Sequence, residues 1–259
     1  MIVYKYNNVF DHIEKTLIEK YGNNPKYDKV VIAMGYNVLK NFDFLREQYP
    51  GFKIIAYQLE HLVNSSPWVS KGARKVLAGA DEIWDYDKDN ITWMRKNYKL
   101  NAKFKPLMYT ESLKILPPLV EKDCDIDVLF YGYMHPRRAQ LILKLQHDFA
   151  GKYKIFDLYG VWGKELDEYI ARSKVILNVS SETIARQEQP RIYYPVINGR
   201  CVLSEKHIVN YFGDSIVEAT YKDIPEKIQE LLKKGTWLDV ACQASTKYQN
   251  FSKKFEQFL

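Results

Sequence analysis

The chain has 259 residues, of which 46% are hydrophobic, 14% aromatic and 27% charged. This length suits two domains better than one core, and the composition excludes a disordered chain. The formal net charge is +6, and residues 1–110 hold most of it, with 17 lysines and arginines against 12 aspartates and glutamates.

Short β-branched or aromatic runs alternate with amphipathic segments in the first half, a pattern that predicts βαβ units around a parallel sheet. The predicted strands cover residues 2–4, 29–33, 53–57, 82–84 and 103–105, and the predicted helices cover 9–21, 38–48, 69–78 and 90–98. Two adjacent prolines and mixed charge then predict a linker over 117–125. We therefore place a first Rossmann-like domain at 1–116.

The second half repeats this rhythm and predicts a second Rossmann-like domain over 126–237. Its predicted strands cover residues 127–131, 154–158, 175–179, 201–203 and 215–217, and its predicted helices cover 136–149, 164–173, 189–198 and 224–234. A last helix within 238–259 has no strand after it. The fold class expected is α/β, with two doubly wound domains facing each other across a cleft, so that ligands bind at the carboxyl ends of strands.

Three polar motifs follow predicted strands of the second domain. In the first, Gly132 allows a sharp turn, and Pro136, Arg137 and Arg138 open a helix whose free N–H groups favour an anion such as a diphosphate. A plain strand-to-helix turn with solvated arginines is the alternative.

The second motif is an aromatic residue between two glycines. Tyr159 and Gly160 follow a strand, and Trp162 comes directly before Gly163. Exposed backbone beside a planar ring is a seat for a nucleotide base. Trp162 as an ordinary core residue is the competing interpretation.

The third motif is the richest in polar groups. Ser180, Ser181 and Glu182 follow a strand, and Glu188 and Arg191 flank the start of a helix. A carboxylate there can accept two ribose hydroxyls, and the arginine can reach a phosphate, although a capping carboxylate and a surface arginine would have the same local sequence.

The order of these motifs resembles the nucleotide-binding domain of GT-B glycosyltransferases. The resemblance covers most of the second half, and it rests on Phe130-Tyr131-Gly132, Arg137-Arg138, Glu188-x-x-Arg191, Asn198-Gly199 and Ser204-Glu205. It implies a nucleotide-diphosphate sugar as donor substrate, with no other cofactor and no metal. Many retaining members carry two glutamates eight positions apart, whereas Glu182 and Glu188 are six apart here.

The resemblance also implies roles for these residues and for the first domain. Glu188 would hold the ribose, Arg191 with Arg137 or Arg138 would hold the diphosphate, and the first domain would hold the acceptor. The helix within 238–259 would cross back to that domain.

The first domain offers a candidate general base. Glu60 and His61 come directly after a predicted strand, and an inverting transfer needs such a group to deprotonate the acceptor hydroxyl. A Glu60 that only caps a helix or pairs with a lysine is the alternative. Gly35, which follows another strand, would allow a close approach of substrate, although an ordinary turn explains it as well.

Alternating carboxylates over residues 85–89 mimic a metal-binding DxD motif and the start of a calcium loop. Asn90 stands where a calcium loop has its turn glycine, and Lys96 stands at the bidentate glutamate position. Capping of a helix by Asp89 fits better, and we expect no bound metal.

Basic residues of the first domain predict the acceptor. Lys71, Arg74, Lys75, Arg95 and Lys96 lie on two predicted helices, where they would attract a phosphate backbone. Small transferases of the resembling type are known from viruses that glycosylate hydroxymethylated bases of their own DNA. Double-stranded DNA with modified bases is therefore one predicted partner; the alternatives are a cell-surface or lipid-linked glycan as acceptor, or a non-catalytic two-domain binding protein.

Cysteine usage and hydropathy predict where the protein works. Cys124, Cys201 and Cys242 form no CxxC pair, which favours a reducing compartment without structural zinc. No apolar run approaches the roughly 20 residues of a membrane span, and the sequence MIVYKYNNVF lacks the pattern of a secretory signal. We expect a cytoplasmic protein, in the host cytoplasm if it is viral.

Overall fold

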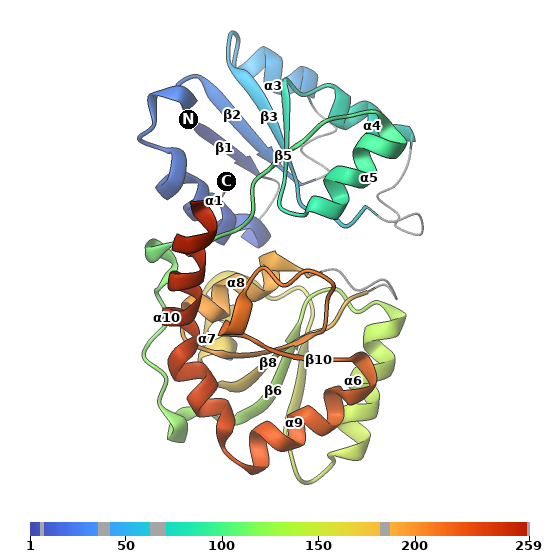
Figure 1. Ribbon diagram of the computed structural model, residues 1–259, viewed down its shortest axis with the longest axis vertical. Coiled ribbons are helices and arrows are strands. Elements are labelled where there is room, and N and C mark those ends of the chain that lie inside the picture. The colour runs from blue at the N-terminus through green and yellow to red at the C-terminus, as the bar shows by residue number, and fades with distance from the viewer. Residues whose placement is uncertain (6–7, 36–41, 63–70, 182–186, 258–259) are drawn as a thin grey trace. The chain divides into compact units, whose positions relative to one another are not determined.

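The computed structural model describes residues 1–5, 8–35, 42–62, 71–181 and 187–257. Contacts within the chain divide it into two compact units, Met1–Leu107 and Met108–Leu259. Each unit is an α/β fold built on a five-stranded parallel sheet (Figure 1). This confirms the prediction of two Rossmann-like halves.

The first unit pairs its strands in chain order, β1-β2-β3-β4-β5, all parallel. The strands are β1 Ile2–Lys5, β2 Val30–Met34, β3 Lys53–Gln58, β4 Glu82–Asp85 and β5 Lys103–Phe104. The helices are α1 Asp11–Tyr21, α3 Phe42–Gln48, α4 Lys71–Ala78 and α5 Lys88–Tyr98, and parts of the helices predicted over 38–48 and 69–78 lie outside the described residues.

Side chains along each strand of the first sheet point alternately to its two faces. Other residues of the unit pack on both faces. On one face, the core joins Ile54 and Ala56 to residues of α3, α4 and α5. On the other face, the ring of Trp84 packs against Tyr57 and against Tyr21 of α1, with ring centroids 6.1 and 5.2 Å apart.

The second unit has the strand order β10-β9-β8-β6-β7, again all parallel. Its strands are β6 Ile126–Tyr131, β7 Ile155–Leu158, β8 Ser173–Asn178, β9 Cys201–Glu205 and β10 Val217–Ala219. After β6, the chain forms β7 on one side of β6 and then β8 on the opposite side of β6. The order therefore reverses between β6 and β8, and α/β folds bind ligands at the carboxyl ends of strands at such a point.

In the described part of the second unit, five helices cover the sheet: α6 Pro136–Asp148, α7 Gly163–Ala171, α8 Gln189–Ile197, α9 Ile224–Lys233 and α10 Thr236–Glu256. One core cluster contains Phe130 and Leu177 with residues of α6, α9 and α10, and α7 and α8 contact β6, β8 and β9. Across the described ranges, every helix is too short or too polar to cross a membrane.

The strand predicted at 215–217 begins later in the structure. Gly213–Ser215 form a 3-10 turn, and β10 covers Val217–Ala219. Gly213 has a φ of +57°, and the Ser215 hydroxyl donates to the Phe212 carbonyl at 2.6 Å. A turn closed by its own side chain therefore occupies the start of the predicted strand.

The segment that follows Leu107 packs on the second unit. The Asn198 side-chain oxygen accepts from the N–H groups of Ile115 and Leu116, both at 2.9 Å, and its amide nitrogen donates to the Leu113 carbonyl. The buried Arg200 donates to the Pro117 carbonyl at 2.8 Å. The division of the chain therefore falls before the expected boundary at residue 116.

The last helix, α10, contacts α8, α9 and β9 of the second unit. Its Ser252 hydroxyl accepts from the N–H of Tyr109 at 3.0 Å. That this helix also reaches the first unit stays a prediction.

Replacing Asn198 with alanine should destabilise the second unit. The change removes four hydrogen bonds, including one to Tyr194, and leaves backbone groups without partners. We expect a loss of about 2–4 kcal/mol in the free energy of unfolding, measured by urea denaturation. Asn97→Ala, which removes one exposed bond to the Trp93 carbonyl, is the control and should cost less than about 1 kcal/mol. Equal losses of unfolding free energy in the two variants would contradict a stabilising role for the Asn198 hydrogen bonds.

Candidate functional site

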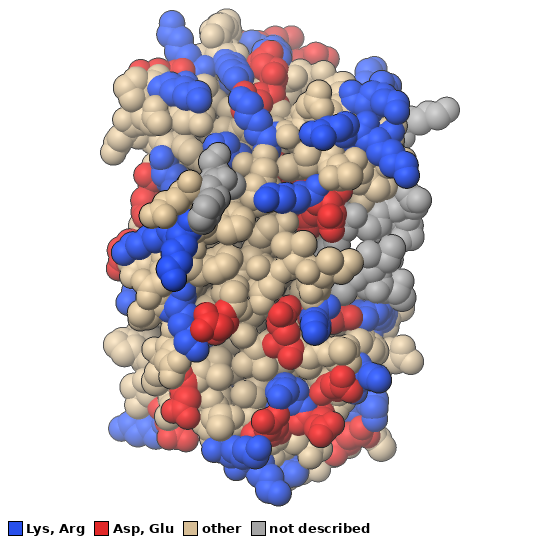
Figure 2. All heavy atoms as spheres, viewed as in Figure 1, with Lys and Arg blue, Asp and Glu red and all other residues tan. Residues whose placement is uncertain are grey.

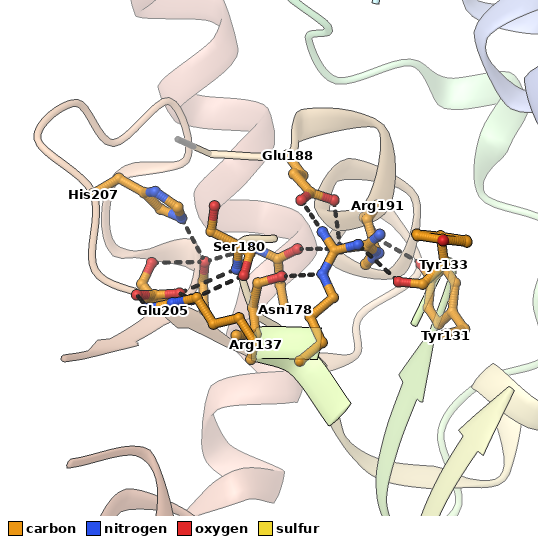
Figure 3. A network of polar contacts seen from close by, with 12 residues as sticks. Tyr131, Tyr133, Arg137, Asn178, Ser180, Glu188, Arg191, Glu205 and His207 are labelled. Atoms are coloured by element: carbon orange, nitrogen blue, oxygen red, sulfur yellow. Dashed lines mark hydrogen bonds and ion pairs between the residues drawn. The ribbon is translucent and has the colours of Figure 1, made fainter. Parts of the chain in front are cut away.

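Buried polar side chains gather where β6, β8 and β9 end in the second unit (Figure 3). Gly132 follows β6, Ser180 lies two residues beyond β8, and Glu205 ends β9. Parallel strands bring their carboxyl ends to one edge, which explains how segments distant in sequence meet here. This edge contains the switch point of the sheet.

Glu188 lies between two arginines. Its carboxylate contacts the Arg138 guanidinium and, through Oε2, lies 2.5 Å from Nη1 of Arg191. The three side chains are 15%, 5% and 11% exposed, respectively. Glu188 directly precedes α8, but its side chain accepts no capping hydrogen bond from the helix. Its carboxylate instead forms ion pairs with the two arginines.

Arg138 is held from three directions. Its Nε donates to the Val179 carbonyl at 2.8 Å and its Nη1 to the Tyr133 carbonyl at 2.9 Å, in addition to the Glu188 contact. Burial lowers the pKa of Arg138 to about 10, although the charge of Glu188 raises it. The guanidinium therefore stays charged at neutral pH.

Arg137 turns to a different partner. It donates to the Glu205 carboxylate and to the Ser180 carbonyl, both at 2.8 Å, and its guanidinium lies 4.0 Å from the centre of the Tyr221 ring. The Ser180 N–H also donates to Glu205, at 3.1 Å. Neighbouring arginines on one helix thus anchor separate halves of the site.

Arg191 is held in place by the last residues of β8 and β6. Its Nη1 donates to the Asn178 side-chain oxygen at 3.1 Å, and the Tyr131 hydroxyl donates to its carbonyl at 2.7 Å. Gly132 has a φ of +122°, and a Cβ there would lie 2.6 Å from Nη2 of Arg191. Glycine at this position therefore makes room for the arginine.

Exposed aromatic rings border this network. Tyr133 and Tyr159 are 63% and 69% exposed and pack edge to face, with ring centroids 5.9 Å apart. Trp162 is 38% exposed, so its interpretation as a core residue is wrong. Gly160 has a φ of +74° and open space around it. Tyr133, whose carbonyl accepts from Arg138, and the adjoining Tyr159 therefore leave exposed rings next to the network.

The structure brings together most of the predicted donor residues of the second unit. Gly132, Arg137, Arg138, Glu188 and Arg191 lie in one network with the Ser180 backbone. Ser181 is half-buried next to it, Tyr159 and Gly160 are exposed after β7, and Glu182 lies outside the described residues.

Three further residues hold the arginines of this network. Asn178 and Glu205 stand in the motifs noted in the sequence, but their partners could not be assigned from spacing. Tyr221 has no local signal, because it meets Arg137 from a segment 84 positions away, where its hydroxyl donates to the Arg137 carbonyl.

Glu60 and His61 follow β3 at the carboxyl edge of the first sheet, and both are half-buried. The Glu60 carbonyl accepts from the Asn90 amide at 2.8 Å, so the loop is fixed to α5. Gly35 follows β2 with a φ of +86° and lies against the Phe10 ring, where a Cβ would approach to 2.8 Å.

The cap of α5 differs from the prediction. Asp87 caps this helix by accepting from the N–H groups of Asp89 and Asn90 at 2.6 and 3.1 Å, so the assignment to Asp89 is wrong. The helix begins two residues earlier than the pattern suggested. Within the described ranges, no group of three or more His, Cys, Asp or Glu side chains is arranged to hold a metal ion.

The predicted acceptor residues lie on two helices. Arg74 and Lys75 on α4 and Arg95 and Lys96 on α5 are exposed, and Lys71 is the first residue of α4. The Arg74 Nε donates to the Tyr98 carbonyl at 2.9 Å, which joins α4 to the end of α5. Figure 2 shows lysine and arginine side chains gathered at the upper right, over these two helices.

Comparison with known proteins identifies the fold. No family model and no curated protein matches the sequence. Among solved structures, Anabaena Alr3699/HepE in complex with UDP and glucose matches with a TM-score of 0.59 and 9% identity, over 89% of this chain and 77% of that one. A glycosyltransferase from Rickettsia africae matches with a TM-score of 0.52 and 10% identity, over 97% and 80%.

A third match is TarM, with a TM-score of 0.58 and 10% identity. It covers 88% of this chain but 53% of TarM, so the protein spans about half of that relative's length. Together with the two parallel-sheet units, these matches show that the chain has the GT-B glycosyltransferase fold.

Replacing Gly132 with alanine should disturb this site more than its backbone strain alone. Gly151→Ala is the matched control, because Gly151 also has a positive φ, of +72°, but a methyl group added there would meet nothing within 4 Å. We expect losses of about 2–3 kcal/mol for Gly132→Ala and about 1 kcal/mol for Gly151→Ala, measured by chemical denaturation. A loss for Gly132→Ala no larger than the control would show that Arg191 moves freely.

Proposed function

We propose that the protein is a glycosyltransferase that moves a sugar from a nucleotide-diphosphate sugar to an acceptor hydroxyl. One observation carries this proposal: three arginines and two carboxylates are largely buried at the switch point of the second sheet. The GT-B fold, and the UDP and glucose in the matching Anabaena structure, support the choice of donor.

The chemistry of the site suits a diphosphate and a ribose. Three guanidinium groups against two carboxylates leave an excess of one positive charge, which attracts the negatively charged diphosphate of a donor. Glu188 contacts one arginine through each oxygen, and a carboxylate has about four acceptor positions, so it can also accept ribose hydroxyls. Tyr133, Tyr159 and Trp162 offer planar surfaces to the base.

The arginines also suggest how the leaving group is stabilised. Negative charge develops on the diphosphate as the glycosidic bond breaks, and fixed guanidinium groups stabilise that charge without reorganisation. We therefore propose a transfer that needs no metal, with full activity in excess EDTA.

If the transfer inverts the anomeric centre, Glu60 or His61 of the first unit is the proposed base, and both Glu60→Gln and His61→Ala should then be assayed.

We further propose that the acceptor is a hydroxymethylated base in double-stranded DNA. The basic side chains of α4 and α5 support this, because exposed lysines and arginines on adjoining helices attract a phosphate backbone irrespective of sequence. The target base would leave the stack to reach the transferred sugar.

We also propose a location in a reducing cytoplasm, that of the host if the protein is viral. Two free cysteines are buried and Cys242 is exposed, which supports a reducing compartment.

Glu188→Gln should weaken nucleotide binding. Isothermal titration of UDP, ADP, GDP and dTDP should find at least one tight ligand, and Glu188→Gln should raise its Kd about tenfold or more, because a charged acceptor for the ribose becomes neutral. Glu226→Gln, at an exposed glutamate of α9, is the control and should leave the Kd unchanged. Equal affinity in Glu188→Gln would contradict the assignment, and a failure of all four nucleotides to bind would contradict the donor class.

The acceptor is tested with DNA. Enzyme and radiolabelled nucleotide sugars are incubated with a duplex containing 5-hydroxymethylcytosine and with the unmodified duplex, and we expect sugar incorporation only in the first. A double change Arg95→Gln/Lys96→Gln should lower kcat/KM for DNA about tenfold at low salt, because two exposed cations are lost. Donor hydrolysis without incorporation would rule out DNA and favour a glycan acceptor, whereas binding without hydrolysis or transfer would favour the non-catalytic alternative.

A further inference from the structure

A second concentration of charge lies in the first unit, away from the carboxyl ends of its strands. A hollow of about 90 Å³ lies there, beside the strand starts. Its lining includes Lys26, Tyr27, Lys53, Glu82, Lys103 and Lys105. Four ammonium groups therefore surround one carboxylate.

The sheet explains why these side chains meet. Lys53, Glu82 and Lys103 are the first residues of β3, β4 and β5. The register pairs Ile55 with Glu82 and Trp84 with Lys103, and side chains two residues apart share a face. All three therefore point to the Trp84 face of the sheet, opposite to the core that α5 covers. Lys103 and Lys105 do not continue the basic surface of Arg95 and Lys96.

Glu82 is already satisfied. Its carboxylate accepts from Lys53 at 2.6 Å, from Lys103 at 2.8 Å and from the Trp84 ring nitrogen at 2.6 Å. Burial raises the pKa of Glu82, but these hydrogen bonds outweigh it and hold the pKa at about 2. The carboxylate is therefore ionised at neutral pH and accounts for one of the four positive charges.

The remaining two cations differ from Lys53 and Lys103. In the described part of the chain, Lys26 and Lys105 form no ion pair with a carboxylate. Lys105 lies 5.3 Å from the ring centres of both Tyr21 and Trp84, which fixes it over the aromatic cluster. Burial and then the charge of Lys26 lower the pKa of Lys105, as expected where like charges are confined.

We propose that this hollow binds a phosphate group. A multiply charged oxyanion would balance the excess of three positive charges, and its oxygens would accept hydrogen bonds from Lys26 and Lys105 while Lys53 and Lys103 keep Glu82. The site is separate from the proposed donor site, which belongs to the other unit. The phosphate comes either from a small phosphate compound or from a nucleic-acid backbone.

The test is hydrogen exchange with mass spectrometry on the full chain, with inorganic pyrophosphate as the probe. We expect pyrophosphate to protect residues 24–30 and 102–107, and titration of that protection to give a Kd. Lys26→Gln, at an exposed position, should raise this Kd about threefold to tenfold, and Lys26→Gln/Lys105→Gln by more than about tenfold. Lys105→Arg keeps the charge and should bind like wild type.

Lys15→Gln is the matched control, because Lys15 is an exposed lysine of the same unit outside the hollow. Protection confined to residues 131–138 and 188–192 would overturn the phosphate site while leaving the donor site intact. Equal affinity in the double variant and in Lys15→Gln would also overturn it. A short DNA duplex is the second probe: protection of the same segments by the duplex assigns the phosphate to a nucleic-acid backbone, and protection by pyrophosphate alone assigns it to a small compound.

Discussion

The carboxylate of Glu188 between Arg138 and Arg191 is the interaction on which the second unit's functional edge depends. All three charges are largely removed from water, so each is tolerable only while the others remain in place. The position of Arg191 in turn requires the missing side chain of Gly132 and the amide of Asn178. A single carboxylate thus fixes residues from β6, β8, α6 and α8 in one arrangement.

The two units use different charge strategies. In the second unit, planar guanidinium groups meet carboxylates and backbone carbonyls in fixed directions, and Arg137 also lies over Tyr221. Such fixed donors suit a ligand that must be oriented for reaction. In the first unit, the cations around Glu82 are ammonium groups, which lack the planar donor fork of arginine and therefore suit attraction of an anion more than its precise placement. The arginines of the second unit thus suit the proposed orientation of a donor, and the lysines of the first unit suit the proposed binding of a phosphate group.

The alternation of apolar runs with amphipathic segments predicted the fold well, because the buried strands contain short apolar runs, such as Val128–Phe130 in β6 and Val175–Leu177 in β8. The motifs also placed Arg137, Arg138, Glu188 and Arg191 at strand ends, where parallel pairing brings them together. Their partners could not be predicted. Whether Arg137 meets Glu205 or Glu188 depends on rotation about one helix, and the part played by Tyr221 depends on tertiary packing that no spacing rule contains.

Helix α8 connects the network to the course of the chain. Arg191 lies in its first turn, while Asn198, the residue after its end, holds the backbone at Leu113, Ile115 and Leu116. This backbone lies a few residues beyond the first unit. A helix of nine residues therefore has the proposed donor site at its first turn and, at its other end, the anchor for the segment of chain that leads out of the first unit.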